Sequence, residues 1–385
     1  MQKIIITSVL FGFSWATVAQ TTPEAAVAAA LQQHPSVKAA SMEVQAKKQA
    51  ERASLDLSNP EVNMESPTGE FYAVGVLQSF DFPTVYKRRK QAARAETGLA
   101  RAEQRLSENE LRYTVRRLYL ETQVAAYNHR QWAIRDSLYQ QIAGSALRQF
   151  EAGEIDFLQK TMAEIEAGKV RQDFLAARQS LERSRQQLSQ LTGIAELGNL
   201  TELEADTTAQ TVASENAPVL AYQQQAIQVA EQQIRLAKSR ALPGFSIGYL
   251  NQGPRETPLD YRFCASVGIP LWAGQYSAGR KAAEIEAQAV QHRSQAAAQT
   301  LELEWERTRS EINTYLGQLR YYQTTALPQS RSLRAAALRL RDAGQLDYPA
   351  FLRSLDEAWT LQSEYANLIE NLNNAQLYLR YLAGE

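Results

Sequence analysis

The chain contains two copies of one sequence pattern. The matched pairs of residues are Pro35 and Pro218, Pro60 and Pro243, Gly153 and Gly344, and Asp156 and Asp347. The two members of each of the first two pairs are 183 residues apart (218 − 35). The two members of each of the last two pairs are 191 residues apart (344 − 153). A fixed offset over nearly the whole chain indicates two copies of one structural unit. Because the offset grows by 8 (191 − 183), we expect the second copy to be longer in one loop.

The first residues have the composition of a secretory signal peptide. Lys3 precedes an apolar stretch over residues 4–13, and small residues follow as far as Ala19. This apolar run is about half of the roughly 20 residues that a membrane-spanning helix needs. The sequence therefore predicts a signal peptide over residues 1–19 and an exported protein.

Charge and residue counts argue against several function classes. The 41 basic and 42 acidic residues give a net charge of −1, which does not fit the basic surface of a nucleic-acid-binding protein. The single cysteine is Cys264, and the three histidines are scattered without the spacing of metal ligands. The sequence has no glycine-rich phosphate loop, no G-x-S-x-G motif and no H-E-x-x-H motif. We therefore expect no enzyme activity, no cofactor and no metal site.

Both copies have the same predicted order of elements: a helix, two short strands, a very long helix, a turn and a return helix. Good helix formers dominate outside the strands. The predicted helices cover residues 23–57, 84–149 and 157–192 in the first copy, and 217–241, 273–340 and 349–382 in the second. The predicted units are a first repeat over 20–194 (strands near 61–82, helical hairpin 84–192), a polar linker over 195–215, and a second repeat over 216–385 (strands near 244–271, helical hairpin 273–382).

The long helices are unusual for a soluble domain. A helix of roughly 66 residues is about 100 Å long at 1.5 Å per residue. Such a helix needs neighbours along its whole length, and apolar residues at coiled-coil spacing are present to contact them. On the return helix of the first copy, Phe174, Leu181 and Leu188 recur every seven residues. The pattern predicts long helices packed side by side.

Between the helices the hydrophobic period changes to two, which is typical of half-buried strands. The candidate membrane-facing residues on these strands are Tyr72, Val74, Val76, Phe80, Phe82, Phe263, Val267 and Ile269. The longer strand of each copy is predicted to have about 11–12 residues, enough for a tilted strand to cross a bilayer. Alternation alone leaves two interpretations open, a membrane strand and a soluble hairpin buried against protein.

Four strands are too few to close a membrane barrel. Known membrane β-barrels begin at about 8 strands, and an open sheet edge is not tolerated in hydrocarbon. If the strands span a membrane, several chains must therefore share one barrel. Three chains that contribute roughly 12 strands make the natural small ring.

Short motifs recur at matching places in both copies. They are HPSVK at 34–38 and APVL at 217–220, Asn59-Pro60 and Leu242-Pro243, Phe82-Pro83 and Ile269-Pro270, FEAGEIDFL at 150–158 and RDAGQLDY at 341–348, and the closing Leu191-Thr192-Gly193 and Leu382-Ala383-Gly384. With these motifs the chain resembles the TolC family of bacterial outer-membrane efflux proteins over essentially all of its predicted mature length.

One motif is similar to the heavy-metal branch of this family (CusC/CzcC-like). It is the stretch SFDFPTVYKRR at residues 79–89. That branch commonly has a Gly-Gly-Lys-Arg step, and this chain has Val85-Tyr86 in place of the two glycines. Many family members also carry a lipidated cysteine after the signal peptide, which this chain lacks. These departures concern the class of substrate rather than the fold.

The resemblance implies a mainly α-helical fold with a small membrane β-barrel. Three identical chains would form a 12-stranded β-barrel in the outer membrane, continued by a long α-helical barrel into the periplasm. The implied function is the outer-membrane channel of a tripartite efflux system, with heavy-metal cations or small toxic molecules as cargo. The implied partners are the other two copies in a homotrimer, a periplasmic adaptor (membrane fusion) protein, an inner-membrane RND-type pump and outer-membrane lipid.

The turns between the long and return helices hold the candidate gating and adaptor-docking residues. These residues are Arg148, Gly153, Glu154, Asp156, Arg339, Asp342, Gly344 and Asp347. The glycines supply the backbone freedom that ends a helix. The aspartates either cap the following helices or, with the glutamates nearby, form acidic rings that favour cations. The arginines are expected to pair with these acids and hold the tip closed.

Two alternative functions stay open. One is an outer-membrane duct for type I secretion, which uses the same kind of channel. The other is a periplasmic coiled-coil adaptor or structural protein that never enters the membrane. Adaptors have one helical hairpin flanked by small β-domains, whereas two hairpins and four strands are predicted here.

Overall fold

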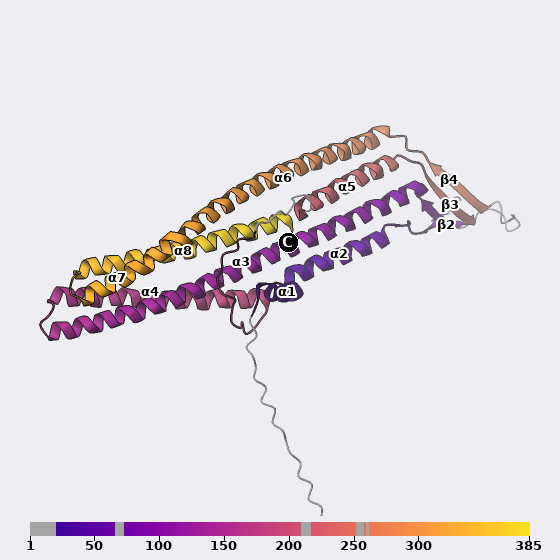
Figure 1. Cartoon of the computed structure of the whole chain (residues 1–385). Helices are drawn as coiled ribbons and strands as arrows, with labels where there is room; N and C mark the ends of the chain where they lie inside the picture. Colours follow the sequence, from indigo (N-terminus) through magenta and orange to yellow (C-terminus); the bar gives the residue numbers. More distant parts are fainter. Residues whose placement is uncertain (1–20, 66–72, 209–216, 252–257, 259–261) are drawn as a thin grey trace, which may run out of the picture.

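The computed structural model describes the chain except for residues 1–20, 66–72, 209–216, 252–257 and 259–261. The protein is elongated, with a small sheet at one end and two helical turns at the other (Figure 1). It is mainly helical with one small antiparallel sheet, which confirms the predicted fold class. The predicted signal peptide, residues 1–19, lies outside the described residues.

Among the residues that the structure describes, the first copy contains four helices and two strands. They are α1 (Pro23–Gln33), α2 (Pro35–Ala53), β1 (Glu61–Glu65), β2 (Ala73–Phe80), α3 (Pro83–Glu151) and α4 (Phe157–Thr192). The two long predicted helices are confirmed. The predicted single helix over 23–57 is wrong, because the chain breaks at His34, whose ψ of 131° is extended. Pro35 disfavours the helical conformation in the residue before it and then starts α2.

The second copy repeats this order with one difference. Its elements are α5 (Pro218–Ser239), β3 (Gly244–Asn251), β4 (Phe263–Gly268), α6 (Ala273–Tyr321), the π-helical turn η3 (Tyr322–Ala326), α7 (Leu327–Asp342) and α8 (Tyr348–Ala383). The predicted continuous helix over 273–340 is therefore interrupted. Pro328 lies just after η3 and has no N–H to donate to the carbonyl four residues earlier, so the local hydrogen bonding is altered.

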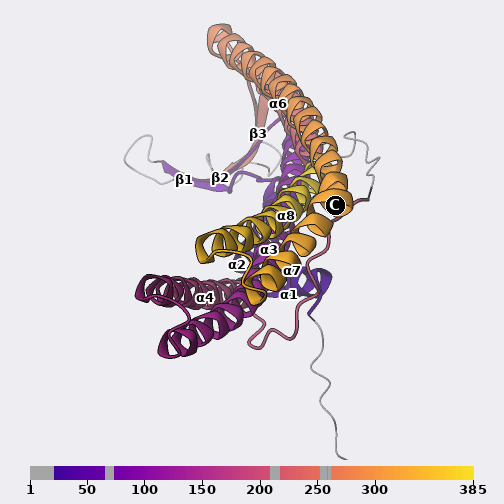
Figure 2. The same ribbon diagram turned by 60° about the vertical axis from the view of Figure 1, so that its left-hand side comes forward.

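The helices form an elongated wall in place of a compact globule. In the half next to the sheet, α3 packs between α2 and α5, and α5 packs against α6. In the half next to the turns, α3 packs between α4 and α8, and α8 packs against α7 (Figures 1 and 2). The apolar core is accordingly divided into clusters along the wall, of which one joins α6 to α8 and another joins α1 to α3 and α4.

The helical stacks of the two copies close in the same way. Each return helix ends on a glycine with positive φ, Gly193 at 71° and Gly384 at 88°. A side chain at Gly193 would meet Gln33 of α1, and one at Gly384 would meet Pro218 of α5. These close approaches place the end of each return helix directly against the short helices at the start of its own copy. The repeat therefore holds in three dimensions.

The sheet has the strand order β1-β2-β3-β4, and all neighbours are antiparallel. Its register puts apolar side chains together on one face across all four strands. That face contains Val62, Met64, Val74, Val76, Phe80, Phe245, Ile247, Tyr249, Phe263, Ala265 and Val267, with Gln78 and Asn251 as polar exceptions. The opposite face contains Glu61, Asn63, Gly75, Leu77, Ser79, Gly244, Ser246, Gly248, Leu250, Cys264, Ser266 and Gly268.

The strands are shorter than predicted at their helical ends. β2 ends at Phe80, and Phe82 is the extended residue that precedes α3. β4 ends at Gly268, so Ile269 lies outside the strand because Pro270 follows it and has no N–H for a ladder. The assignment of Phe82 and Ile269 to strands is therefore wrong. Tyr72 lies outside the described residues. Among the helices that the structure describes, none is long and apolar enough to cross a membrane.

Candidate functional site

The two helical turns lie at the same end of the molecule (Figures 1 and 2), and each turn is built in the same way. At the first, Gly153 has a φ of 74°, and the Glu154 N–H donates to the Gln149 carbonyl at 2.8 Å. At the second, Gly344 has a φ of 67°, and the next N–H donates to the carbonyl five residues back at 2.9 Å. A left-handed glycine with this hydrogen bond is the Schellman ending of a helix. Both glycines therefore end their helices, as the sequence predicts, while their part in gating and docking stays a prediction.

The aspartates at the turns cap the return helices. Asp156 Oδ1 accepts the Gln159 N–H at 2.8 Å, and Asp347 Oδ1 accepts the Ala350 N–H at 2.8 Å. A carboxylate in this position satisfies an otherwise unpaired N–H and lies at the positive end of the helix dipole. The capping interpretation is thus confirmed for both residues. A capped carboxylate keeps its negative charge at the surface, so capping does not remove the acidic-ring interpretation.

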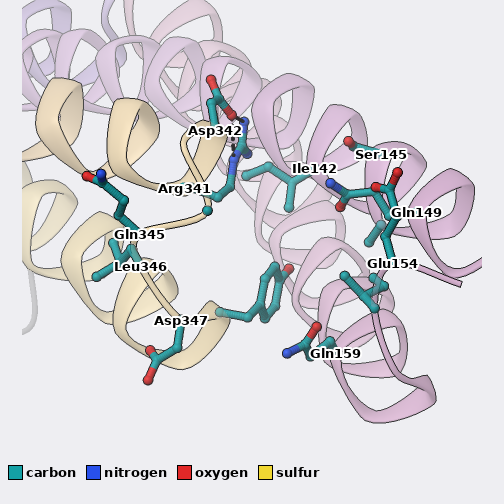
Figure 3. A pocket seen from close by; sticks show the side chains of 14 residues that line it. Ile142, Ser145, Gln149, Glu154, Gln159, Arg341, Asp342, Gln345, Leu346 and Asp347 are labelled. Atoms are coloured by element: carbon teal, nitrogen blue, oxygen red, sulfur yellow. Dashed lines mark hydrogen bonds and ion pairs between the residues drawn. The ribbon is translucent and has the colours of Figure 1, made fainter.

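A cleft separates the two turns. It has a volume of about 620 Å³ and is lined by residues of α3, α4, α7 and α8 and by both turns (Figure 3). The polar and charged residues that line it are Ser145, Gln149, Glu154, Gln159, Arg341, Asp342, Gln345, Asp347 and Tyr348. Four of the predicted tip residues line this cleft, namely Glu154, Asp342, Gly344 and Asp347. The cleft is a mixed-charge groove open to solvent, which suits a protein partner better than a buried small ligand.

The ion pair at the tip differs from the expected one. Among the described residues, neither Arg148 nor Arg339 forms an ion pair with a carboxylate. Arg341 forms it instead, with Nη2 at 2.6 Å from Asp342 Oδ1. The Arg341 guanidinium also lies over the ring of Phe351, 4.8 Å from its centroid. Arg339 and Arg341 lie two residues apart at the end of α7, and no sequence feature distinguishes which of them pairs with the carboxylate.

Two tyrosines at the cleft, Tyr348 on its wall and Tyr139 behind it, are not among the predicted site residues. Tyr139 of α3 and Tyr348 of α8 belong to an apolar cluster that joins α3, α4, α7 and α8. Burial raises the pKa of each phenol to about 12, and the negative charge of Glu166 adds to the rise. Arg341 opposes the rise at Tyr348. Within the described residues, the buried Tyr348 hydroxyl has no hydrogen-bond partner. Both tyrosines act here as packing residues for the tip.

The second candidate site is the apolar face of the sheet. Of the predicted membrane-facing residues, Val74, Val76, Phe80, Phe263 and Val267 all lie on this one face. Except for half-buried Phe80, their side chains are 44% to 65% exposed, although they are large and apolar. Ile269 is 70% exposed beside the sheet, and Phe82 packs its ring 5.9 Å from that of Phe245. A contiguous apolar surface of this kind marks a membrane or protein contact.

The edges of the sheet are open. β1 pairs only with β2, and β4 pairs only with β3, so each outer strand has one unpaired side within the described part of the chain. Open edges invite pairing with a further strand. The described residues contain no cluster of three or more His, Cys, Asp or Glu side chains that is arranged to hold a metal ion. The candidate site therefore consists of two surfaces, the tip cleft and the apolar face of the sheet.

The fold matches solved outer-membrane channels. A structure of CusC is 18% identical with a TM-score of 0.80, over 95% of this chain and 92% of CusC. VceC from Vibrio cholerae is 15% identical with a TM-score of 0.77, over 94% of this chain and 96% of VceC. The open-state MtrE channel from Neisseria gonorrhoeae is 14% identical with a TM-score of 0.75, over 94% of this chain and 88% of MtrE. No family model matches the sequence, and a comparison with curated proteins finds no match. At these identities the likeness establishes the fold.

Proposed function

We propose that this chain, which has the fold of TolC-type outer-membrane channels, is the exit duct of a tripartite efflux system. Three copies form one channel, with the sheets in the outer membrane and the helical wall in the periplasm. The observation that carries the proposal is the four-stranded sheet, because its apolar face is continuous across all strands and both of its edges are open.

The open edges support an oligomer. Unpaired backbone groups in hydrocarbon cost several kcal/mol each, so a sheet inserted in a membrane must close. Antiparallel pairing of β4 with β1 of the next copy continues the observed strand order. Three copies then close a ring of roughly 12 strands, which lies within the known range of membrane barrels. The polar and small residues of the opposite face line the pore of that ring.

The tip cleft supports a docking role. We assign it to a periplasmic adaptor protein that links the channel to an inner-membrane pump of the RND type. The cleft lies at the end of the helical wall farthest from the sheet, where such a partner arrives (Figure 1). Arg341 and Asp342 form an exposed ion pair there, which contributes only about 0–1 kcal/mol. A partner can therefore displace it at small cost, and the tips are free to rearrange.

We propose that the channel conducts heavy-metal cations or small toxic molecules without binding them tightly. Glu151, Glu154, Asp156, Asp342 and Asp347 gather near the turns, and in a trimer each position occurs three times. Rings of carboxylates favour cations through their field. Substrate choice then depends on the pump and the adaptor.

Conductance of the purified protein in a planar bilayer tests the proposal. We expect discrete channels with cation selectivity. Asp156→Asn with Asp347→Asn should reduce that selectivity because asparagine keeps the cap and removes the charge. Unchanged conductance and selectivity in this variant would refute the acidic ring. Release of the protein from membranes by carbonate, with no conductance, would favour the periplasmic adaptor alternative.

A further inference from the structure

Basic residues are concentrated where the helices meet the sheet. The four segments next to the strands are residues 47–58, 81–94, 232–243 and 269–284. Together they contain 13 Lys or Arg (3 + 5 + 3 + 2) and 4 Asp or Glu (2 + 1 + 0 + 1). The whole chain has 41 basic and 42 acidic residues, so this excess is local. The end of the wall beside the sheet is therefore strongly positive in a protein that is nearly neutral.

One set of these residues forms a continuous surface that we call the basic shoulder. It consists of Lys48 and Arg52 of α2 with Lys87, Lys90 and Arg94 of α3, and all five are exposed. Lys48, Arg52 and Lys90 line one surface cleft of about 390 Å³ together with Glu51, Leu55 and Arg101. Within the described residues, none of the five forms an ion pair with a carboxylate. The cleft therefore holds more basic than acidic side chains and keeps a net positive charge.

The basic shoulder lies on the side of the wall that continues the apolar face of the sheet. Phe82 packs its ring against Phe245 of the apolar face, so the preceding Asp81 is directed to the other side, and Asp81 pairs with Arg89 at 2.6 Å. Arg89 therefore marks the polar side of α3. At about 100° per residue, Lys87, Lys90 and Arg94 lie roughly 100–160° around the helix from Arg89. They point away from the polar side, toward the side on which Val74, Val76 and Phe80 lie.

Two of the five positions of the basic shoulder are also basic in the second copy. Arg52 corresponds to Arg235 at the offset of 183 (235 − 52), and Lys90 corresponds to Lys281 at the offset of 191 (281 − 90). Arg235 and Lys281 are exposed, and neither forms an ion pair among the described residues. Each chain therefore presents two such positive positions next to its sheet. A trimer presents six of them around the barrel.

We infer that the basic shoulder binds the anionic headgroups of phospholipids in the membrane leaflet nearest the helices. This inference rests on the proposed function, because it needs the sheet to lie in a membrane. Lys87 and Lys90 lie about 6 and 10 Å along α3 from its start at Pro83, which is within and just beyond a headgroup layer of roughly 5–8 Å beside the hydrocarbon. The apolar stems of Lys and Arg can extend along Leu55 while their charges reach the phosphates.

A lipid surface explains the observations better than a free anion does. The positive charges are spread over two helices and repeated around the channel, whereas a single anion site would be compact. They also lie beside exposed apolar residues, with Leu55 at 53% and Leu57 at 59% exposed. Apolar and basic side chains together are the composition of a membrane–water interface. The shoulder then sets the depth and tilt of the channel in the membrane.

The test measures lipid binding to the detergent-solubilised full chain by native mass spectrometry. Phosphatidylglycerol is compared with neutral phosphatidylethanolamine, at 50 mM and at 500 mM salt. The shoulder variant is Lys48→Gln, Arg52→Gln, Lys90→Gln and Arg94→Gln. The matched control is Arg183→Gln, Arg320→Gln, Arg331→Gln and Arg353→Gln, because these four arginines are also exposed and unpaired among the described residues but lie on helices away from the sheet.

At low salt, the wild type and the control should prefer phosphatidylglycerol at least tenfold. The shoulder variant should lose most of this preference, because each basic residue near an anionic surface contributes up to roughly fivefold in affinity. High salt should weaken the preference in the wild type as well.

Two results would overturn the inference. One is an equal preference for phosphatidylglycerol in the wild type and the shoulder variant. The other is competition by millimolar inorganic phosphate, which would indicate a free-anion site. A conducting trimer that shows no lipid preference contradicts this inference alone, whereas a chain that forms no trimer contradicts the proposed function.

Discussion

Asp156 and Asp347, 191 residues apart (347 − 156), cap equivalent helices with the same bond. Each Oδ1 accepts the N–H of the third residue onward at 2.8 Å. The identity of the two caps shows that the two tips are copies in their hydrogen bonding as well as in their sequence. The same carboxylates can have two separate roles. One is to cap the helix, and the other is to contribute a negative charge at the tip.

Substitution by alanine and by asparagine distinguishes these roles. Asp156→Ala should destabilise the helical wall by about 1 kcal/mol, because the capping acceptor is lost. Asp156→Asn should cost much less, because its amide oxygen still accepts the bond. Thermal unfolding followed by circular dichroism in detergent measures both, with the same pair at Asp347 as an internal repeat. Equal losses for alanine and asparagine would contradict the capping account.

The tip glycines should be sensitive to any side chain. Gly153→Ala and Gly344→Ala should each cost about 1 kcal/mol or more, because φ is positive at both positions while nothing lies within 4 Å of an added Cβ. The penalty is therefore conformational and not steric. Gly168→Ala is the matched control: it lies within α4 with the same open surroundings, and alanine should stabilise the helix there. A neutral Gly153→Ala would contradict the left-handed turn.

The tip should lose stability in alkali. The pKa of Tyr139 and of Tyr348 is raised to about 12, above the ordinary value of 10.0. Below pH 10 both states hold the proton, and above pH 10 the unfolded state loses it first. Stability should therefore fall between about pH 10 and 12, by up to about 1.4 kcal/mol per pH unit for each tyrosine. Unfolding midpoints measured across this range check the slope.

Phenylalanine variants test whether the two tyrosines cause the loss of stability between pH 10 and 12. Tyr348→Phe should be neutral or slightly stabilising at pH 7, because the buried hydroxyl has no partner among the described residues. Together with Tyr139→Phe it should flatten the decline between pH 10 and 12. A decline that is as steep in the double variant as in the wild type would assign the alkaline loss to other groups.

The two faces of the sheet should respond differently to charge. Val76→Arg places a charge on the apolar face near the middle of β2, where it should cost about 2–4 kcal/mol in a membrane. Leu77→Arg is the control on the neighbouring residue, which lies on the opposite face. The first variant should lose heat-modifiable trimer in the outer-membrane fraction, and the second should keep it. Similar trimer yields for the two would contradict the assignment of the faces.

Local sequence signals were sufficient for most of the helices. The return helix over 157–192 was predicted with its observed bounds, since Asp156 supplies its cap and Gly193 its left-handed end. The break at His34 precedes Pro35, and the π-helical turn precedes Pro328. Neither interruption was predicted, although both prolines are visible in the sequence. A proline in a long apolar pattern either kinks the helix, interrupts it or starts a new one, and packing decides among these outcomes.

Other features depend on tertiary packing and have no local signal. The alternation of the strands predicted which residues share a face, but only the register of β2 with β3 shows that the apolar faces of both copies join. The cleft between the tips and the cluster that contains Tyr139 and Tyr348 arise where α3 meets α7 and α8. Residues so far apart in sequence cannot be matched from composition or period alone.

The central claim is that separate copies of the chain close one barrel, and a cysteine cross-link tests it most directly. Cys264 lies in β4 on the polar face, and Glu61 and Asn63 lie in β1 on the same face. Within one chain β2 and β3 separate these strands by about 14 Å, which is too far for a disulfide. Glu61→Cys or Asn63→Cys should therefore cross-link only between copies.

After oxidation of outer-membrane fractions, at least one of these two variants should give covalent dimers and trimers on a non-reducing gel. Adding Cys264→Ser to the same variant should abolish the bands. Monomers alone in both variants, or a dimer that never extends to a trimer, would contradict the shared barrel.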